Sequence, residues 1–174
     1  MNNIENTVNL LWDKVRNLEN EILQVRDGTL GWTTNVKARI YLSAVQSIPS
    51  GAWTVVQLNK VDYNPGGYFN TSLYRFIAPI SGYYAFNYQV FWVATTVGDA
   101  YGQLLRKNGN TWVGAYNYMA GYGTSAHSAS DCDIIHLAKN DYVELMAYQN
   151  SGTDKSLDTH IYGTFMAVHL LSRD

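Results

Sequence analysis

The chain has 174 residues, of which 47% are hydrophobic, 14% aromatic and only 15% charged, and its formal net charge at pH 7 is −2. This length suits one ordinary domain with a short appendage, and the near-neutral charge gives no reason to expect nucleic acid as a partner. So few charges predict a folded surface that is either unusually uncharged or substantially buried between subunits. The single cysteine excludes an internal disulfide framework, and no apolar run approaches the ~20 residues that membrane insertion requires.

The first 27 residues carry an uninterrupted heptad repeat. Its apolar residues are spaced alternately four and three apart: Ile4, Val8, Leu11, Val15, Leu18, Ile22 and Val25. In a parallel coiled coil the flanking positions pair opposite charges, Lys14 with Glu19 and Glu21 with Arg26. An amphipathic helix packed on its own domain would favour a 3.6 period and a wider stripe. We therefore predict a parallel coiled-coil stalk at residues 1–27, followed by a linker at residues 28–36; the heptad itself leaves dimer and trimer open.

Residues 37–174 are predicted to form an all-β domain. Segments with strand-like apolar patterns follow one another without an intervening helical pattern. Turn sequences, such as Asn64-Pro65-Gly66-Gly67 and Asn108-Gly109, separate them. Runs of strands with turns at this spacing indicate a β-sandwich of about eight to ten strands.

The stretch from Tyr74 to Val93 is the most apolar part of this domain and is interrupted once, by Pro79 and Gly82. Because successive side chains alternate across a strand, the even-numbered residues from 84 to 92 share one face and the odd-numbered residues from 83 to 91 the other. Neither face carries a charge. We expect the first face to fill the core and the second to be covered by another subunit. The predicted core residues are Phe76, Tyr84, Phe86, Val90, Leu104, Val143, Leu145 and Phe165.

The same stretch carries a family resemblance. Arg75-Phe76, Pro79 and Gly82-Tyr83-Tyr84 resemble the most recognisable signature of the complement C1q-like family, a branch of the tumour-necrosis-factor-like jelly rolls. Similar pieces follow in that family's order at residues 38–44, 105–109, 137–145 and 161–171. The chain departs from the family pattern at Asn140-Asp141, where the family usually has Gly-Asp, and in lacking a preceding collagen-like stretch.

The resemblance implies a jelly-roll head that forms homotrimers, with the heptad stalk in place of collagen. A threefold stalk beneath a threefold head is the arrangement in which the two symmetries agree. We predict that the seven heptad residues and, on the head, Tyr83, Asn87 and Gln89 make the contacts between chains.

No enzymatic activity is predicted. The four histidines lack metal-protease or triad spacing: His127, His136, His160 and His169. Some relatives of the fold bind calcium, but Asp131, Cys132 and Asp133 alternate across a strand and cannot all face one ion. We therefore expect no cofactor and no metal, with calcium as the remaining alternative.

A Tyr-, Gly- and Asn-rich segment at residues 112–124 has the composition of a binding surface. We expect Trp112 and Tyr116 to pack in the core or between subunits. Exposed contacts are predicted from Tyr118 and Tyr122 and from the loop at residues 150–158. The candidate ligand-binding residues are Tyr118, Tyr122, Thr153, Asp154 and Lys155, with a cell-surface glycan or protein as ligand.

No secretion signal is visible at the N-terminus. A compact C1q-like chain of this kind resembles a bacteriophage virion appendage, a head fibre or tail protein assembled in the host cytoplasm. Its stalk would attach to a capsid or tail protein, and its head would bind the host surface. Two alternatives stay open: a secreted or spore-surface C1q-like adhesion or signalling module, and a capsid decoration protein that only stabilises the particle.

Overall fold

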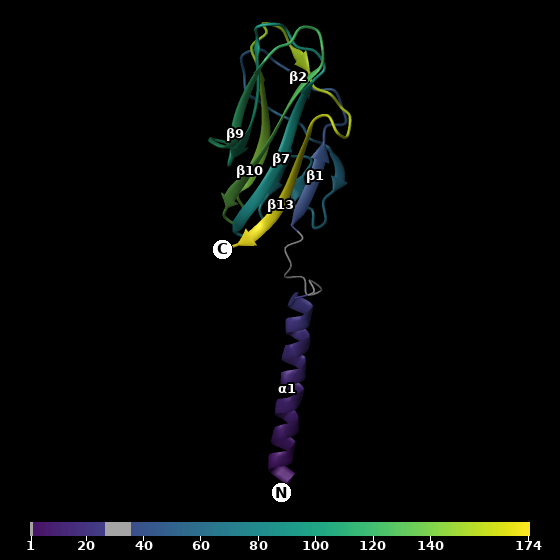
Figure 1. Ribbon diagram of the computed structural model, residues 1–174, viewed down its shortest axis with the longest axis vertical. Coiled ribbons are helices and arrows are strands. Elements are labelled where there is room, and N and C mark those ends of the chain that lie inside the picture. Colours follow the sequence, from purple (N-terminus) through teal and green to yellow (C-terminus); the bar gives the residue numbers. More distant parts are fainter. Residues whose placement is uncertain (1, 27–35) are drawn as a thin grey trace. The chain divides into compact units, whose positions relative to one another are not determined.

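The computed structural model describes residues 2–26 and 36–174, which form two compact units (Figure 1). The first is the helix α1 (Asn2–Arg26), which lies within the predicted stalk. The second, called the head below, begins at Val36, whose carbonyl oxygen accepts a hydrogen bond from the Leu170 N–H at 2.9 Å. The rest of the predicted linker, residues 28–35, lies outside the described residues.

α1 carries its apolar heptad residues along one stripe. The described members are all exposed in the single chain: Val8, Leu11, Val15, Leu18 and Ile22. The side chains of Ile4 and Val25 lie outside the described part. A single helix of 25 residues is marginal in water, so burying this stripe against other chains would stabilise it. Within the described residues, no helix is long and apolar enough to cross a membrane.

The head is a sandwich of antiparallel strands, as the sequence predicts. One sheet has five strands in the order β10-β7-β13-β1-β4. The other has six strands: five follow the order β5-β6-β11-β8-β9, and the sixth, β3, pairs with β11. β2 and β12 form a small ribbon. The strands are β1 (Lys37–Tyr41), β2 (Ser47–Ile48), β3 (Thr54–Val55), β4 (Lys60–Tyr63), β5 (Phe69–Asn70), β6 (Arg75–Ile77), β7 (Gly82–Trp92), β8 (Ala100–Lys107), β9 (Thr111–Ala120), β10 (His127–Leu137), β11 (Tyr142–Gln149), β12 (Lys155–Ser156) and β13 (Phe165–Arg173).

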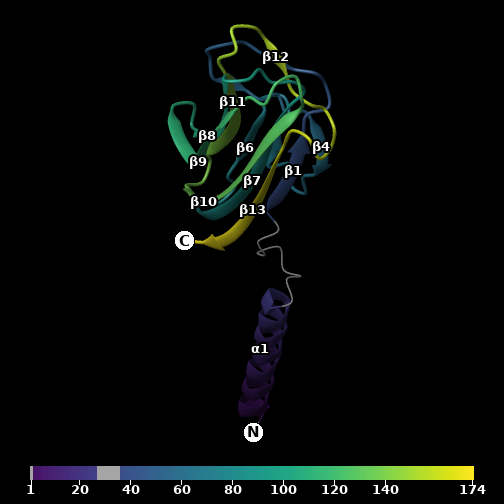
Figure 2. The ribbon, with the colours of Figure 1, turned by 45° about the horizontal axis from the view of Figure 1, so that its top comes forward.

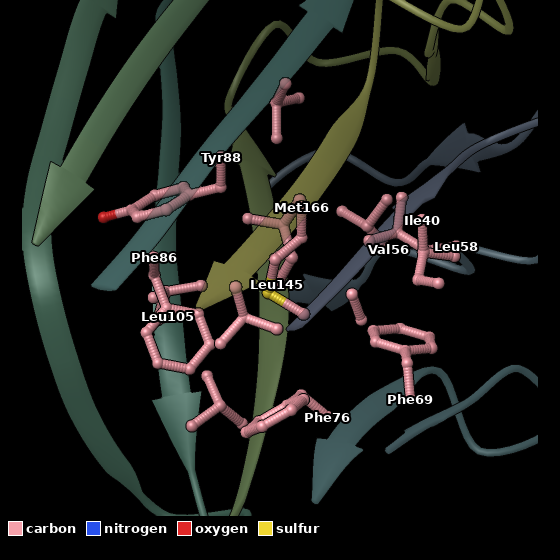
Figure 3. Close-up of a cluster of buried hydrophobic side chains, with 14 of the residues drawn as sticks. Ile40, Val56, Leu58, Phe69, Phe76, Phe86, Tyr88, Leu105, Leu145 and Met166 are labelled. Carbon is pink, nitrogen blue, oxygen red and sulfur yellow. The ribbon is translucent and has the colours of Figure 1, made fainter. Parts of the chain in front are cut away.

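The core lies between these two sheets (Figure 3). On β7 the even-numbered residues from 84 to 92 are fully buried, which confirms the predicted phase of that strand. Phe76, Val143 and Leu145 join them from the other sheet. Burial of this contiguous apolar cluster is the main source of the head's stability.

Two predicted core residues lie elsewhere. Phe165 is only half-buried and lies on the outer face of the five-stranded sheet, because β13 turns Met166, Val168 and Leu170 inward. The prediction for Phe165 is therefore wrong by one residue. Leu104 is buried, but it lies on the outer face of the six-stranded sheet and outside the main core cluster.

The turn at Asn140-Asp141 is joined to the turn at Asn108-Gly109. Asn140 has a φ of 73°, so it supplies the left-handed conformation that glycine usually provides. The Asp141 carboxylate accepts hydrogen bonds at 2.8 Å from the Asn108 side chain and the Ala138 N–H, and pairs with Lys107 at 2.6 Å. Burial raises the pKa of Asp141, but these hydrogen bonds and the Lys107 charge outweigh it and hold the pKa below its ordinary value.

The two ends of the head are formed by different loops. The end of β13, the start of β1 and the start of β7 lie together, since Arg173 pairs with Gly82 and Lys37 with His169. The loops after β7, β9 and β11 lie at the opposite end, near the β2–β12 ribbon (Figures 1 and 2). This opposite end is called the loop end below.

Candidate functional site

The outer face of the five-stranded sheet carries a mixture of apolar and uncharged polar residues over its three strands β10, β7 and β13. Its outward positions are Ser128, Ser130, Cys132, Ile134 and His136 on β10, Tyr83, Ala85, Asn87, Gln89 and Phe91 on β7, and Phe165, Ala167, His169 and Ser172 on β13. None of these positions, all in the described part of the chain, is Lys, Arg, Asp or Glu. Ile134 remains 58% exposed and Tyr83 48% exposed in the single chain. We call this surface the uncharged face.

The middle of the uncharged face is held rigid by hydrogen bonds. The Gln89 side-chain nitrogen donates to the Gly163 carbonyl at 2.7 Å, and its oxygen accepts from the Ser130 hydroxyl at 2.8 Å. Asn87 is exposed and lies between Ala167 and Cys132 in the register. The three predicted contact residues, Tyr83, Asn87 and Gln89, therefore lie on one surface.

Two shallow hollows flank Asn87 on this face. One, of about 310 Å³, is lined among others by Asn87, Ser130, Cys132 and Phe165. The other, of about 460 Å³, is lined by Asn87 and Cys132 together with residues that include Ala85 and Ile134. Both are open, and each has one acidic residue in its lining, Asp131 in the first and Asp133 in the second.

Paired groups lie along two margins of the uncharged face. Arg39 on β1 lies 4.4 Å above the Phe165 ring, 3.2 Å from Asp62 and 2.8 Å from the Ile161 carbonyl oxygen. On the opposite side, His136 lies 2.9 Å from Asp174 and packs edge-on against Tyr83, with 5.0 Å between ring centroids. The uncharged face therefore lies between these two paired margins.

The loop end brings Tyr122 close to Lys155. The Tyr122 side chain is 81% exposed and stacks on His127, with ring centroids 6.2 Å apart. Its backbone N–H donates to the Thr95 hydroxyl at 3.0 Å, and Lys155 donates to the Thr96 hydroxyl at 2.9 Å. The loop before β8 therefore connects the two predicted ligand residues.

Two other predicted ligand residues are partly engaged within the head. The Thr153 carbonyl oxygen accepts from the Gln149 side chain at 2.9 Å, and the Asp154 carboxylate accepts from the Ser47 hydroxyl at 3.0 Å. They hold the loop after β11 in place at the same end as Tyr122.

Tyr118 lies elsewhere, on the outer face of the six-stranded sheet. Its ring centroid is 6.1 Å from that of Trp53 and 5.8 Å from that of Tyr148, and Trp53 in turn lies 5.4 Å from Trp112. Trp112 is 53% exposed in the single chain, so the expectation that it packs in the core of the head is wrong, whereas packing between subunits stays a prediction. The side chain of Tyr116 lies outside the described part.

Sequence reasoning missed Trp53 and Tyr148 in this cluster. A signal was present in Gly102, an isolated glycine inside a strand, which often marks a close approach. A Cβ at Gly102 would lie 2.9 Å from the Tyr118 ring and 3.2 Å from Trp53.

The residues considered for metal or acid–base chemistry do not converge. Asp131 accepts from the Gln103 side chain at 2.6 Å and from the Asn117 side chain at 3.3 Å, whereas Cys132 is exposed on the opposite face. Within the described residues, no group of three or more His, Cys, Asp or Glu could hold a metal ion.

The geometry can now be compared with known proteins. The family model of the C1q domain matches residues 41–166. The chain belongs to the C1q-domain family. No curated protein matches it significantly. C1q- and tumour-necrosis-factor-like domains are generally non-enzymatic binding modules and are commonly trimeric.

Solved structures share the fold at low sequence identity. The globular domain of zebrafish complement 1qA protein has a TM-score of 0.64 at 14% identity, over 80% of this chain and 100% of that one. Eiger TNF from S. frugiperda has a TM-score of 0.62 at 10% identity, over 82% and 96% of the two chains. Murine APRIL has a TM-score of 0.62 at 16% identity, over 78% and 98%. At these identities the likeness establishes the jelly-roll fold alone.

Proposed function

We propose that the protein is a homotrimeric, non-enzymatic binding protein in which the uncharged face joins three heads and the loop end binds a cell-surface ligand. The observation that carries the proposal is the uncharged face itself. Sheet faces exposed to water usually carry charged residues, whereas the outward positions of this face carry none and expose Ile134 and Tyr83. Association of three heads would bury this surface and supply side chains to fill the hollows.

The stalk supports the same assembly independently. The heptad of α1 leaves five described apolar residues exposed in the single chain, and each needs a neighbouring helix to be buried. A parallel three-stranded stalk matches the symmetry of a threefold head.

A variant at the uncharged face tests this assembly. Ile134→Arg would place an unpaired charge inside the contact, and burying such a charge is costly. Leu73→Arg is a matched control, because Leu73 is 50% exposed and lies in the turn between β5 and β6, away from this face. Isolated heads carrying Ile134→Arg should be monomeric in analytical ultracentrifugation, whereas Leu73→Arg heads should remain trimeric. Trimeric Ile134→Arg heads would show that association uses another surface.

The ligand is proposed to be a host-surface glycan bound at the loop end. Tyr122 offers a large exposed aromatic ring, and the nearby Lys155 and Asp154 offer hydrogen-bonding groups of both charges. Three such sites on one trimer would gain about 10²-fold or more in avidity where ligands are spaced to match.

Binding of fluorescent purified protein to host cells tests this site. Tyr122→Ala, or replacement of residues 152–155, should reduce binding at least tenfold while the trimer mass is unchanged. Leu73→Ala is the control, because Leu73 is 50% exposed and lies in the turn between β5 and β6, outside the proposed site. Unchanged binding by both loop variants would refute a ligand site at the loop end.

The place of action is proposed to be the surface of a virion, with the stalk attached to a capsid or tail protein. Support comes from the combination of a heptad helix with a C1q-domain head, which suits display from a particle. Mass spectrometry and immunogold imaging of purified particles test this placement. A secreted or spore-surface C1q-like adhesion module uses the same head. Particles that lose stability without the protein, together with absent cell binding, would instead indicate a decoration protein.

A further inference from the structure

Four of the described aromatic side chains cluster on the outer face of the six-stranded sheet, where β9, β8 and β11 lie side by side (Figure 2). Trp53 is at its centre, with ring centroids 5.4 Å from Trp112, 6.1 Å from Tyr118 and 5.2 Å from Tyr148. This set is called the aromatic platform. It lies on the opposite side of the sandwich from the uncharged face.

The sheet is shaped to carry these rings. Gly102 pairs with Tyr118 on one side and with Tyr148 on the other, and a Cβ there would press into the Tyr118 and Trp53 rings. Glycine therefore lets two rings lie directly on the backbone of β8. Rings supported in this way lose little conformational freedom when a ligand stacks on them.

Part of the platform has a structural role, and part is exposed to solvent. Leu104 and Met146 pair in the register next to Gly102, point outward and are still 1% exposed, so the aromatic rings cover them. Trp112 and Tyr118 keep 53% and 42% of their surface exposed.

Polar groups lie at both ends of the platform. At one end, Arg106 pairs with Trp112 in the register and donates to the Glu144 carboxylate at 2.8 Å, and Arg75 reaches the same carboxylate at 2.9 Å. At the other end, the exposed Asn150 accepts from the Ala100 N–H at 2.7 Å. Aromatic rings between hydrogen-bonding groups of both signs suit a ligand with an apolar face and a polar rim.

We propose that the aromatic platform is a second ligand site, which binds a pyranose ring of a carbohydrate. The C–H face of the sugar stacks on Trp112 and Tyr118, and its hydroxyl groups reach the partly exposed Arg106 guanidinium or Asn150. A protein partner is less suited, because the apolar area is small and is bounded by buried ion pairs. This site goes beyond the proposed function, since it does not involve the loop end.

The full chain labelled with 5-fluorotryptophan tests the site by fluorine NMR. It contains five tryptophans, assigned by single substitution, and the probes are methyl glycosides of glucose, galactose, mannose and N-acetylglucosamine. At least one glycoside should shift the Trp53 and Trp112 resonances with a shared dissociation constant. The resonances of Trp92, which is fully buried, and of Trp12 in α1 should stay unchanged. No shift of Trp53 and Trp112 with any of the four glycosides at millimolar concentrations would overturn the proposal.

Matched variants separate this site from the loop end. Trp112→Ala should weaken binding of the glycoside about tenfold or more, whereas Trp112→Tyr, which keeps a flat ring, should retain most of it. An unchanged Trp92 resonance shows that each variant is folded. Tyr122→Ala should leave glycoside binding unchanged. If Tyr122→Ala abolishes binding and Trp112→Ala does not, the platform is refuted and the loop end is supported; the reverse result supports the platform.

Discussion

Phe86 provides a direct test of the core arrangement. Its side chain is fully buried on β7, and its ring lies 5.9 Å from that of Phe76 in an edge-to-face contact. Phe86→Ala removes the buried ring and leaves a cavity that close-packed neighbours fill only in part. The free energy of unfolding should fall by about 3–5 kcal/mol per chain. The lost aromatic pair accounts for about 0.5–1.5 kcal/mol of that change.

Guanidinium unfolding followed by tryptophan fluorescence measures this change. Wild type and variant are compared at one chain concentration, because the stability of an oligomer depends on concentration. Tyr122→Ala also removes an aromatic ring, but an exposed one, and should shift the free energy by no more than about 0.5 kcal/mol. A loss below about 1 kcal/mol for Phe86→Ala would mean that the two faces of β7 are assigned the wrong way round.

Two further predictions concern the turn at Asp141 and the stalk. Because the pKa of Asp141 is lowered, its carboxylate stabilises the fold above the unfolded pKa of about 3.9, and this contribution is lost as pH falls through the folded-state pKa. Asp141→Asn should therefore cost about 1.5–3 kcal/mol at pH 7 and much less at pH 3 in urea unfolding; an equal cost at both pH values would contradict the role of Lys107. In the stalk, Leu11→Asp with Leu18→Asp should abolish the circular-dichroism signal of α1, because charges cannot be buried unpaired. Leu10→Asp, outside the heptad, should leave helicity intact, and equal losses would refute the coiled coil.

Much of the fold could be predicted from the sequence, because alternation and turn chemistry are local. The alternation on β7 identifies its buried side, and Asn108 and Asn140 adopt the positive φ angles expected at their turns. The prediction that Phe165 lies in the core was wrong, because Phe165 is on the outer face of β13. The apolar series Met166, Val168 and Leu170 marks the inner face of β13, while Phe165 is shielded by Arg39, a residue more than 120 positions earlier in the chain.

The binding surfaces were less accessible to sequence reasoning. Tyr83, Asn87 and Gln89 could be grouped, since they share one strand face. Tyr118 could not be separated from Tyr122, because its position depends on long-range pairing of β8 with β9 and β11. Trp53 joins the same cluster from a different segment, so no local pattern brings the two together.

The mass of the purified full chain in dilute solution tests the central proposal most directly. The chain mass is 19.6 kDa, so multi-angle light scattering at low micromolar concentration should give three times that value, about 59 kDa. The heptad of α1 and the uncharged face would each contribute to holding three chains together. A mass of one or two chains would contradict the trimer and, with it, the proposed role of the uncharged face.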